Sequence, residues 1–462
     1  MGREMPKVMN LFKKAPLNAA ARPSWRDYQN RLNRSPKRMN GRRPIVWILI
    51  AGVVFFLLYL GFSSPGAGIV KTAVNIQAPN SNDLLISKKD VQLLLQRTPL
   101  NDLLTDRISL PFKTGGFLVE TSIDRILQDR LVEAMDLKNS RFIGIVVMEA
   151  DSGKVLTLAG YDKTNSNANP CLQSTFPAAS LFKIVTAAAA IDHHHFSCET
   201  PVRFNGYKHT LYKSQLQDSN NAYTHTISFA DSFAQSINPV FGKIGKLNLG
   251  KQVLEQFGQD FGFNQPIDFE LPISPSRLAV EESSYHWAEI ASGFNNDTTI
   301  SPVHAAMMVS AVLNQGLMVN PTVVARIVDA GGREIYRSQA SAHLRAMSPR
   351  ASSILAQMME TTVKSGTARG VFKSIRRDSV LAKLRIGGKT GSIYNRTHDT
   401  RFDWFVGYAE AKDGPGRLIV AALVGHEEYI GTRAGTYARM AMNHYFNDYM
   451  ARKINPGDKT DI

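Results

Sequence analysis

The chain has 462 residues, of which 44% are hydrophobic and 9% aromatic, so it can bury a large core and is not disordered as a whole. Its net charge of +15 is unevenly spread, because residues 1–43 hold twelve Lys and Arg against two acidic residues and so carry +10. The remaining residues carry only +5, which excludes a strongly basic folded body of the kind that binds nucleic acid.

The basic tail is followed by an apolar segment, residues 45–62 (IVWILIAGVVFFLLYLGF), which carries no charge. As a helix it would be about 27 Å long, at roughly 1.5 Å per residue, which just spans the hydrocarbon core of a bilayer. A cleaved signal peptide would have a much shorter basic region, so we predict an uncleaved anchor at 44–62. By the positive-inside rule the tail, 1–43, stays in the cytoplasm, and everything after the anchor lies outside the cytoplasmic membrane. Such a tail is expected to contact anionic lipid headgroups or a cytoplasmic partner, with no nucleic acid as partner.

Beyond the anchor, the sequence divides into a short stalk and a folded domain. Residues 63–115 form the stalk, with a short helix expected over 87–96, where Ser87 precedes an apolar run. The packed domain is expected at 116–452, followed by a C-terminal tail at 453–462.

The domain begins with a helix and a β-hairpin. Residues 123–137 predict a helix with Ile126, Leu127 and Leu131 on its buried face. Residues 142–161 predict a β-hairpin whose first strand is almost wholly apolar and therefore central in a sheet.

The domain ends with strands and a helix, after a mostly helical middle. Strands are expected over 385–395, 403–411 and 417–427, and a final helix over about 435–451. Terminal strands beside an N-terminal hairpin indicate an α+β fold with helices packed on a mostly antiparallel sheet.

The two cysteines, Cys171 and Cys198, leave two alternatives open. In an exported domain they could form a disulfide, and only one pairing exists. Equally, they could be two independent small apolar residues.

The most informative segment is PAASLFKIVTAAAAID, residues 177–192, an Ala-rich apolar stretch with Pro177 at its start. It predicts a buried helix beginning at that proline. Burying the charged side chain of Lys183 in such a helix is energetically unfavourable unless the lysine has a functional role. Ser180 lies three residues earlier on the same face. A buried lysine has a lowered pKa, so its neutral amine can take a proton from a serine hydroxyl.

Two further short motifs could supply polar groups to the same cleft. Ser236 and Asn238 stand two residues apart in a predicted turn, where they can present a hydroxyl and an amide. Lys389 and Thr390 stand on a predicted strand and offer a positive charge and a hydroxyl to a carboxylate. The glycines before Lys389 suggest close approach of another backbone, such as an extended peptide substrate.

Each motif alone is a weak signal, but together they have the order and rough spacing of S-x-x-K, S-x-N and K-T-G. With them the chain resembles the penicillin-binding transpeptidase family over about residues 116–452. Four other stretches support the resemblance: 119–128, 301–324, 365–368 and 403–409. The resemblance implies a penicillin-binding, serine β-lactamase-like fold after a single transmembrane helix, and D,D-transpeptidase activity on peptidoglycan stem peptides.

The resemblance also implies the catalytic roles. Ser180 is the nucleophile that forms an acyl-enzyme with the stem peptide or with a β-lactam, and Lys183 is its general base. Ser236 relays a proton towards the leaving amine.

The remaining motif residues are implied to bind substrate. Asn238 holds the peptide amide, while Lys389 and Thr390 bind the terminal carboxylate. Gly391 and Ser392 complete the strand beside the substrate, and the backbone N–H of Ser392 shares the oxyanion hole with that of the nucleophile. No metal and no organic cofactor is implied.

Two features depart from the family pattern. Ala178 follows Pro177 where the family usually has glycine, which alters the turn before the nucleophile. Between Phe62 and Phe117 there is no room for a glycosyltransferase domain, so a separate glycosyltransferase is an expected partner. The alternatives to a transpeptidase are a D,D-carboxypeptidase and a non-catalytic β-lactam sensor or scaffold of cell-wall synthesis.

Overall fold

The computed structural model describes residues 87–454, apart from 97, 99–103 and 113–114. The predicted cytoplasmic tail and membrane anchor lie outside the described residues. Within the described part of the chain, no helix is long and apolar enough to span a bilayer.

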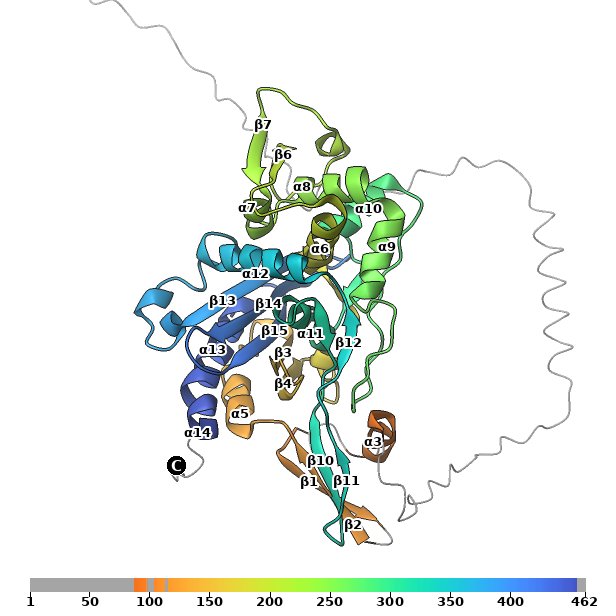
Figure 1. The fold of residues 1–462 in the computed structure, drawn as a ribbon, viewed down its shortest axis with the longest axis vertical. Helices are drawn as coiled ribbons and strands as arrows, with labels where there is room; N and C mark the ends of the chain where they lie inside the picture. The colour runs from red at the N-terminus through yellow and green to blue at the C-terminus, as the bar shows by residue number, and fades with distance from the viewer. Residues whose placement is uncertain (1–86, 97, 99–103, 113–114, 455–462) are drawn as a thin grey trace, which may run out of the picture. The chain divides into compact units, whose positions relative to one another are not determined.

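A five-stranded antiparallel sheet forms the centre of the folded part, in the order β13-β14-β15-β3-β4 (Figure 1). The hairpin and the three late strands predicted from the sequence are therefore confirmed. The central strands are apolar on both faces because helices cover both sides of the sheet. The strands of this sheet are β3 (Ser140–Glu149), β4 (Val155–Asp162), β13 (Leu384–Tyr394), β14 (Arg401–Ala411) and β15 (Arg417–His426).

One face of this sheet packs against the first and last helices of the domain. Helix α5 (Arg125–Glu133) contributes Leu127 and Leu131 to this core layer. The predicted burial of Ile126 is wrong, since its side chain is 47% exposed. Gln128 is buried in the same helix, and its Oε1 accepts a hydrogen bond from the Leu158 backbone N–H at 3.0 Å.

The final helix predicted from the sequence is present on this same face. It consists of α13 (Ala434–His444), a π-helical turn (Tyr445–Tyr449) and α14 (Met450–Ile454).

The opposite face of the sheet packs against a helical layer that carries most of the candidate site residues. Helix α11 covers strands β3, β14 and β15, α12 lies beside α11, and α6 packs against α12. The helices of this region are α6 (Lys183–His194), α7 (Phe229–Ala234), α8 (Asn238–Lys243), α9 (Gly250–Asp260), α10 (Ser284–Ser292), α11 (Pro302–Leu313) and α12 (Pro349–Lys364). Two short two-stranded ribbons join this layer, β5 (Phe176–Pro177) with β8 (Thr299–Ile300) and β6 (Pro201–Asn205) with β7 (Thr224–Ser228).

Part of the segment assigned to the stalk has regular structure. Helix α3 (Lys88–Leu95) forms where predicted, with Ser87 as its N-cap. Strand β1 (Arg107–Phe112) pairs with β2 (Gly115–Thr121) in a four-stranded sheet with β10 (Val324–Asp329) and β11 (Glu334–Arg337). A separate pair joins β9 (Leu317–Val319) to β12 (Ala342–Arg345). The predicted start of the domain at 116 therefore falls within strand β2.

Both cysteines are free thiols, so the disulfide alternative is wrong. Cys171 is buried against the sheet, with Sγ 3.4 Å from the carbonyl oxygen of Ala159, and burial raises the pKa of its thiol. Cys198 is half-buried, and its Sγ lies 3.5 Å from Oε1 of Gln357 on α12.

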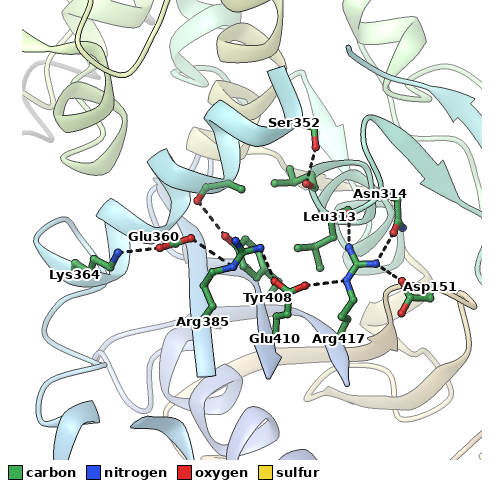
Figure 2. A network of polar contacts seen from close by, with 12 residues as sticks. Asp151, Leu313, Asn314, Ser352, Glu360, Lys364, Arg385, Tyr408, Glu410 and Arg417 are labelled. Carbon is green, nitrogen blue, oxygen red and sulfur yellow. Dashed lines mark hydrogen bonds and ion pairs between the residues drawn. The ribbon is translucent and has the colours of Figure 1, made fainter. Parts of the chain in front are cut away.

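A chain of ion pairs ties helix α12 to the ends of the sheet strands (Figure 2). Arg385 of β13 lies 3.7 Å from Glu360 of α12 and also pairs with Glu410 of β14. Glu410 in turn lies 3.3 Å from Arg417 of β15, which pairs with Asp151. Partly exposed pairs of this kind contribute about 1 kcal/mol or less each, so they orient α12 more than they stabilise the fold.

Candidate active site

The turn that carries Ser180 is tighter than the sequence predicts. Pro177 is paired in strand β5 with Thr299, and Ala179 has a left-handed backbone with φ of 48°. Ser180 lies in a 3-10 turn over Ala179–Phe182, and the α-helix begins only at Lys183. The predicted start of the helix at Pro177 is therefore wrong, because the strand pairing holds that proline in an extended conformation.

The left-handed turn needs a glycine opposite it. A Cβ on Gly293 would lie 1.8 Å from the carbonyl oxygen of Ala179, so no side chain fits there. Left-handed backbone at a non-glycine residue costs about 1–2 kcal/mol and is concentrated at functional sites. This strain and close packing hold Ser180 half-exposed at the helix entrance.

Lys183 lies against Ser180 as the S-x-x-K spacing predicts. Its Nζ is 2.8 Å from Oγ of Ser180 and 2.8 Å from Oδ1 of Asn238, and it also donates to the carbonyl of Ser292. The side chain is fully buried. Burial, and then the nearby charge of Lys389, lower the pKa of Lys183 well below its usual value.

These three contacts determine where the lone pair of a neutral Lys183 amine points. Such an amine has two N–H groups and one lone pair. The carbonyl of Ser292 and Oδ1 of Asn238 can only accept hydrogen bonds, so they take both N–H groups. The lone pair is left to face the Ser180 hydroxyl, which is the arrangement that a general base needs.

The S-x-N motif lies between two short helices. Ser236 joins α7 to α8 with φ of 55°, another left-handed non-glycine residue, and Asn238 is the first residue of α8. Oγ of Ser236 accepts a hydrogen bond from Nζ of Lys389 at 2.9 Å. The predicted turn is thus confirmed, and both motif side chains contact a buried lysine.

Strand β13 brings the K-T-G motif into the same site. Lys389 is fully buried, and its Nζ also donates to the carbonyl of Thr390 at 2.9 Å. Burial lowers the pKa of Lys389 to about 7. A Cβ on Gly391 would lie 3.5 Å from the backbone nitrogen of Ser180, so the strand passes directly beside the turn that carries Ser180.

The two glycines before Lys389 also make room within the sheet. A Cβ on Gly387 would lie 2.6 Å from the ring of Tyr408, and one on Gly388 would lie 2.4 Å from the ring of Phe405. They make room for aromatic side chains of the neighbouring strand β14.

The other residues of the motif have partners that the sequence analysis did not identify. Oγ1 of Thr390 lies 2.6 Å from Oγ1 of Thr367, and Oγ of Ser392 accepts from Nε of Arg401 at 2.9 Å. Thr367 follows α12 in the stretch 365–368, which the resemblance had singled out without a role. Nothing in the sequence pattern pointed to Arg401.

Ser292 was also missed, because its contribution is a backbone carbonyl, which every residue has. The assembled site contains a hydroxyl, a buried amine with a lowered pKa beside it, and a second buried amine that contacts the hydroxyl of Ser236. Such a set can perform nucleophilic acyl transfer on a substrate with a carboxylate. Within the described residues, no group of three or more His, Cys, Asp or Glu could hold a metal ion.

Two curated proteins are similar to this chain in sequence. Stage V sporulation protein D of Bacillus subtilis (strain 168) is 22% identical over 66% of this chain and 48% of its own length. Peptidoglycan D,D-transpeptidase PbpA of Mycolicibacterium smegmatis is 23% identical over 55% of this chain and 51% of its own length. The chain thus spans about half the length of these curated relatives.

Solved structures share the fold. The D,D-transpeptidase domain of a peptidoglycan glycosyltransferase from Eggerthella lenta has a TM-score of 0.60 at 21% identity, covering 73% of this chain and 83% of its own. The penicillin G acyl-enzyme of penicillin-binding protein A from M. tuberculosis has a TM-score of 0.56 at 21% identity, covering 70% and 79%. The family model "Penicillin binding protein transpeptidase domain" matches residues 143–445, well over half of the chain. The chain therefore belongs to the penicillin-binding protein transpeptidase family.

Proposed function

We propose that this protein is a peptidoglycan D,D-transpeptidase that forms peptide cross-links through an acyl-enzyme on Ser180 and is acylated there by β-lactams. The observation that carries the proposal is the contact of Lys183 with Ser180, with both N–H groups of the amine occupied elsewhere. Relatives named as D,D-transpeptidases and a related fold captured as a penicillin acyl-enzyme support it.

In the acylation step, Oγ of Ser180 attacks the carbonyl carbon of the penultimate D-alanine while Lys183 takes the hydroxyl proton. The C–N bond breaks, and the leaving D-alanine amine receives a proton through Ser236. The backbone N–H groups of Ser180 and Ser392 are the expected donors to the developing oxyanion. An acyl ester on Ser180 remains.

In the second step, the acceptor amine attacks the ester carbon and loses a proton. The C–O bond breaks and the proton returns to Ser180. Lys389 and Thr390, with Thr367 beside it, are placed to bind the substrate carboxylate, and Asn238 to position the peptide amide.

The reaction itself can be tested with full-length protein and uncross-linked peptidoglycan from a purified glycosyltransferase. We expect dimeric muropeptides and one free D-alanine for each cross-link, detected by mass spectrometry after digestion of the glycan. Release of D-alanine without dimers would instead identify a D,D-carboxypeptidase. Neither product, from protein that binds penicillin, would identify a sensor or scaffold.

The location of the protein is a further part of the proposal. The apolar segment 44–62 and the +10 tail before it support a single-pass anchor in the cytoplasmic membrane, with the catalytic domain outside. There the domain meets its substrate and a separate glycosyltransferase that makes the glycan.

The proposed topology predicts the behaviour of reporters fused after Ile462. A reporter that works only outside the cytoplasm, such as alkaline phosphatase, should be active there. A reporter that fluoresces only in the cytoplasm should remain dark at the same position. The reverse pair of results would contradict the topology and remove the access to peptidoglycan.

A further inference from the structure

The main chain of residues 205–212, which begins at the end of strand β6, runs beside Asn238. The backbone N–H of Asn238 donates to the carbonyl of Lys208 at 2.7 Å. Its side-chain Nδ2 donates to the carbonyl of His209 at 3.1 Å. Because a carbonyl only accepts, the nitrogen end of the Asn238 amide faces His209 and the oxygen end faces Lys183.

The orientation of this one amide decides whether Lys183 can act as a base. If the amide turned over, Nδ2 would present an N–H to the lysine amine in place of an oxygen. The lone pair of the neutral amine would then accept from Asn238, and Ser180 would lose its proton acceptor. The carbonyl of His209 excludes this arrangement, because the turned amide would bring two oxygens together.

A single buried side chain braces the segment that carries this carbonyl. Gln215, which is 5% exposed, donates from Nε2 to the carbonyls of Asn205 at 2.8 Å and Tyr207 at 3.1 Å. Its Oε1 accepts from the N–H of Tyr212 at 2.9 Å and from Oγ1 of Thr210 at 3.0 Å. All four hydrogen-bonding positions of the amide are filled, and they bridge both ends of the segment.

We propose that Gln215 is a positioning residue for acylation: it fixes the segment 205–212, whose carbonyls orient Asn238 and thereby the lone pair of Lys183. The inference rests on the proposed function, in which Lys183 is the base. It concerns the proton-transfer geometry and leaves the carboxylate-binding residues Lys389 and Thr390 untouched.

The test compares Gln215→Leu with Gln217→Leu in the full-length protein. Gln217 is exposed two residues further on, so the control makes the same chemical change outside the brace. For Gln215→Leu we expect the acylation rate at saturating fluorescent penicillin to fall about 10- to 100-fold, since a general base contributes about 10²- to 10⁴-fold. The dissociation constant of the initial non-covalent complex should change much less than the acylation rate, because the carboxylate contacts remain and only the contact of Asn238 with the peptide amide is disturbed. Gln217→Leu should match the unmodified protein.

One milder variant keeps the inference testable if Gln215→Leu does not fold. Thr210→Val removes one bond to Gln215 and should give a smaller fall in the same rate. Unchanged acylation in the folded variants would overturn the inference. So would equal losses in acylation and in non-covalent binding, which indicate a general loosening of the site.

A readout independent of acylation separates this inference from the proposed function. With full-length protein labelled on asparagine nitrogen, the side-chain amide of Asn238 can be assigned by its loss in Asn238→Asp. We expect one sharp amide pair in the unmodified protein and an exchange-broadened or shifted pair in Gln215→Leu. An unmodified protein that takes up no penicillin would contradict the proposed function. An Asn238 amide signal that is the same in Gln215→Leu as in the unmodified protein would contradict the inference.

Discussion

Replacement of Ser180 by alanine is expected to abolish the covalent penicillin adduct completely. In the unmodified protein, the strained lactam carbonyl should be attacked by Oγ of Ser180, and the adduct should stay on the peptide that contains this residue. Alanine removes one oxygen from a half-exposed position, so the fold should be retained. Mass spectrometry of the intact protein and of its peptides measures both the amount and the position of the adduct.

Lys183→Ala provides the graded control for this prediction. It keeps the nucleophile but removes the amine 2.8 Å from it, so acylation should slow by orders of magnitude without disappearing. Circular dichroism and thermal unfolding establish that each variant is folded. An adduct that persists in Ser180→Ala, or a folded unmodified protein that never reacts with penicillin, would show that the assignment of the nucleophile is wrong.

The S-x-x-K pairing could be predicted because its physics is local. Two side chains three residues apart share a face in either a 3-10 or an α-helical turn, and a lysine in an apolar stretch must be buried. The exact form of the turn could not be predicted. It depends on the pairing of Pro177 with Thr299 and on the absence of a side chain at Gly293, both more than a hundred residues away.

The fold could be predicted from patterns of apolar residues, and the errors in that prediction came from the same patterns. The late strands and the first hairpin are continuous apolar runs, so their positions could be read directly. In α5, however, the apolar pattern placed Ile126 in the core, while the buried position is filled by Gln128, whose amide binds the backbone of β4. A polar residue is buried there because it has a partner, and the partner is not visible in the local sequence.

The contacts that were missed are mostly backbone groups or distant side chains. The carbonyls of Ser292 and His209 orient Lys183 and Asn238. Because every residue has a backbone carbonyl, the residue types at these positions do not indicate this role. Thr367 and Thr390 meet because α12 is held against β13, partly through the ion pair of Glu360 with Arg385 (Figure 2). Such pairings depend on the completed sheet.

The acylation rate is expected to have opposing dependences on pH from its two buried lysines. Lys183 must be neutral to accept a proton, so the rate should rise with pH through its lowered pKa. Lys389 must be charged to attract the carboxylate of penicillin, and burial lowers its pKa to about 7. Above that pH the free protein loses the ammonium, so the second-order rate constant should fall, by about 15-fold between pH 7 and pH 8.5.

Two controls identify Lys389 as the origin of the alkaline fall. The methyl ester of the same penicillin has no carboxylate, so its rate constant should not fall above pH 7. In Lys389→Arg the guanidinium stays charged, so the fall should move beyond pH 10. At saturating penicillin the fall should also shift to higher pH, because the bound carboxylate stabilises the ammonium and raises the pKa of Lys389. A flat rate constant from pH 7 to pH 10 with the free carboxylate would contradict this account, because it would mean that the buried amine does not act through its charge.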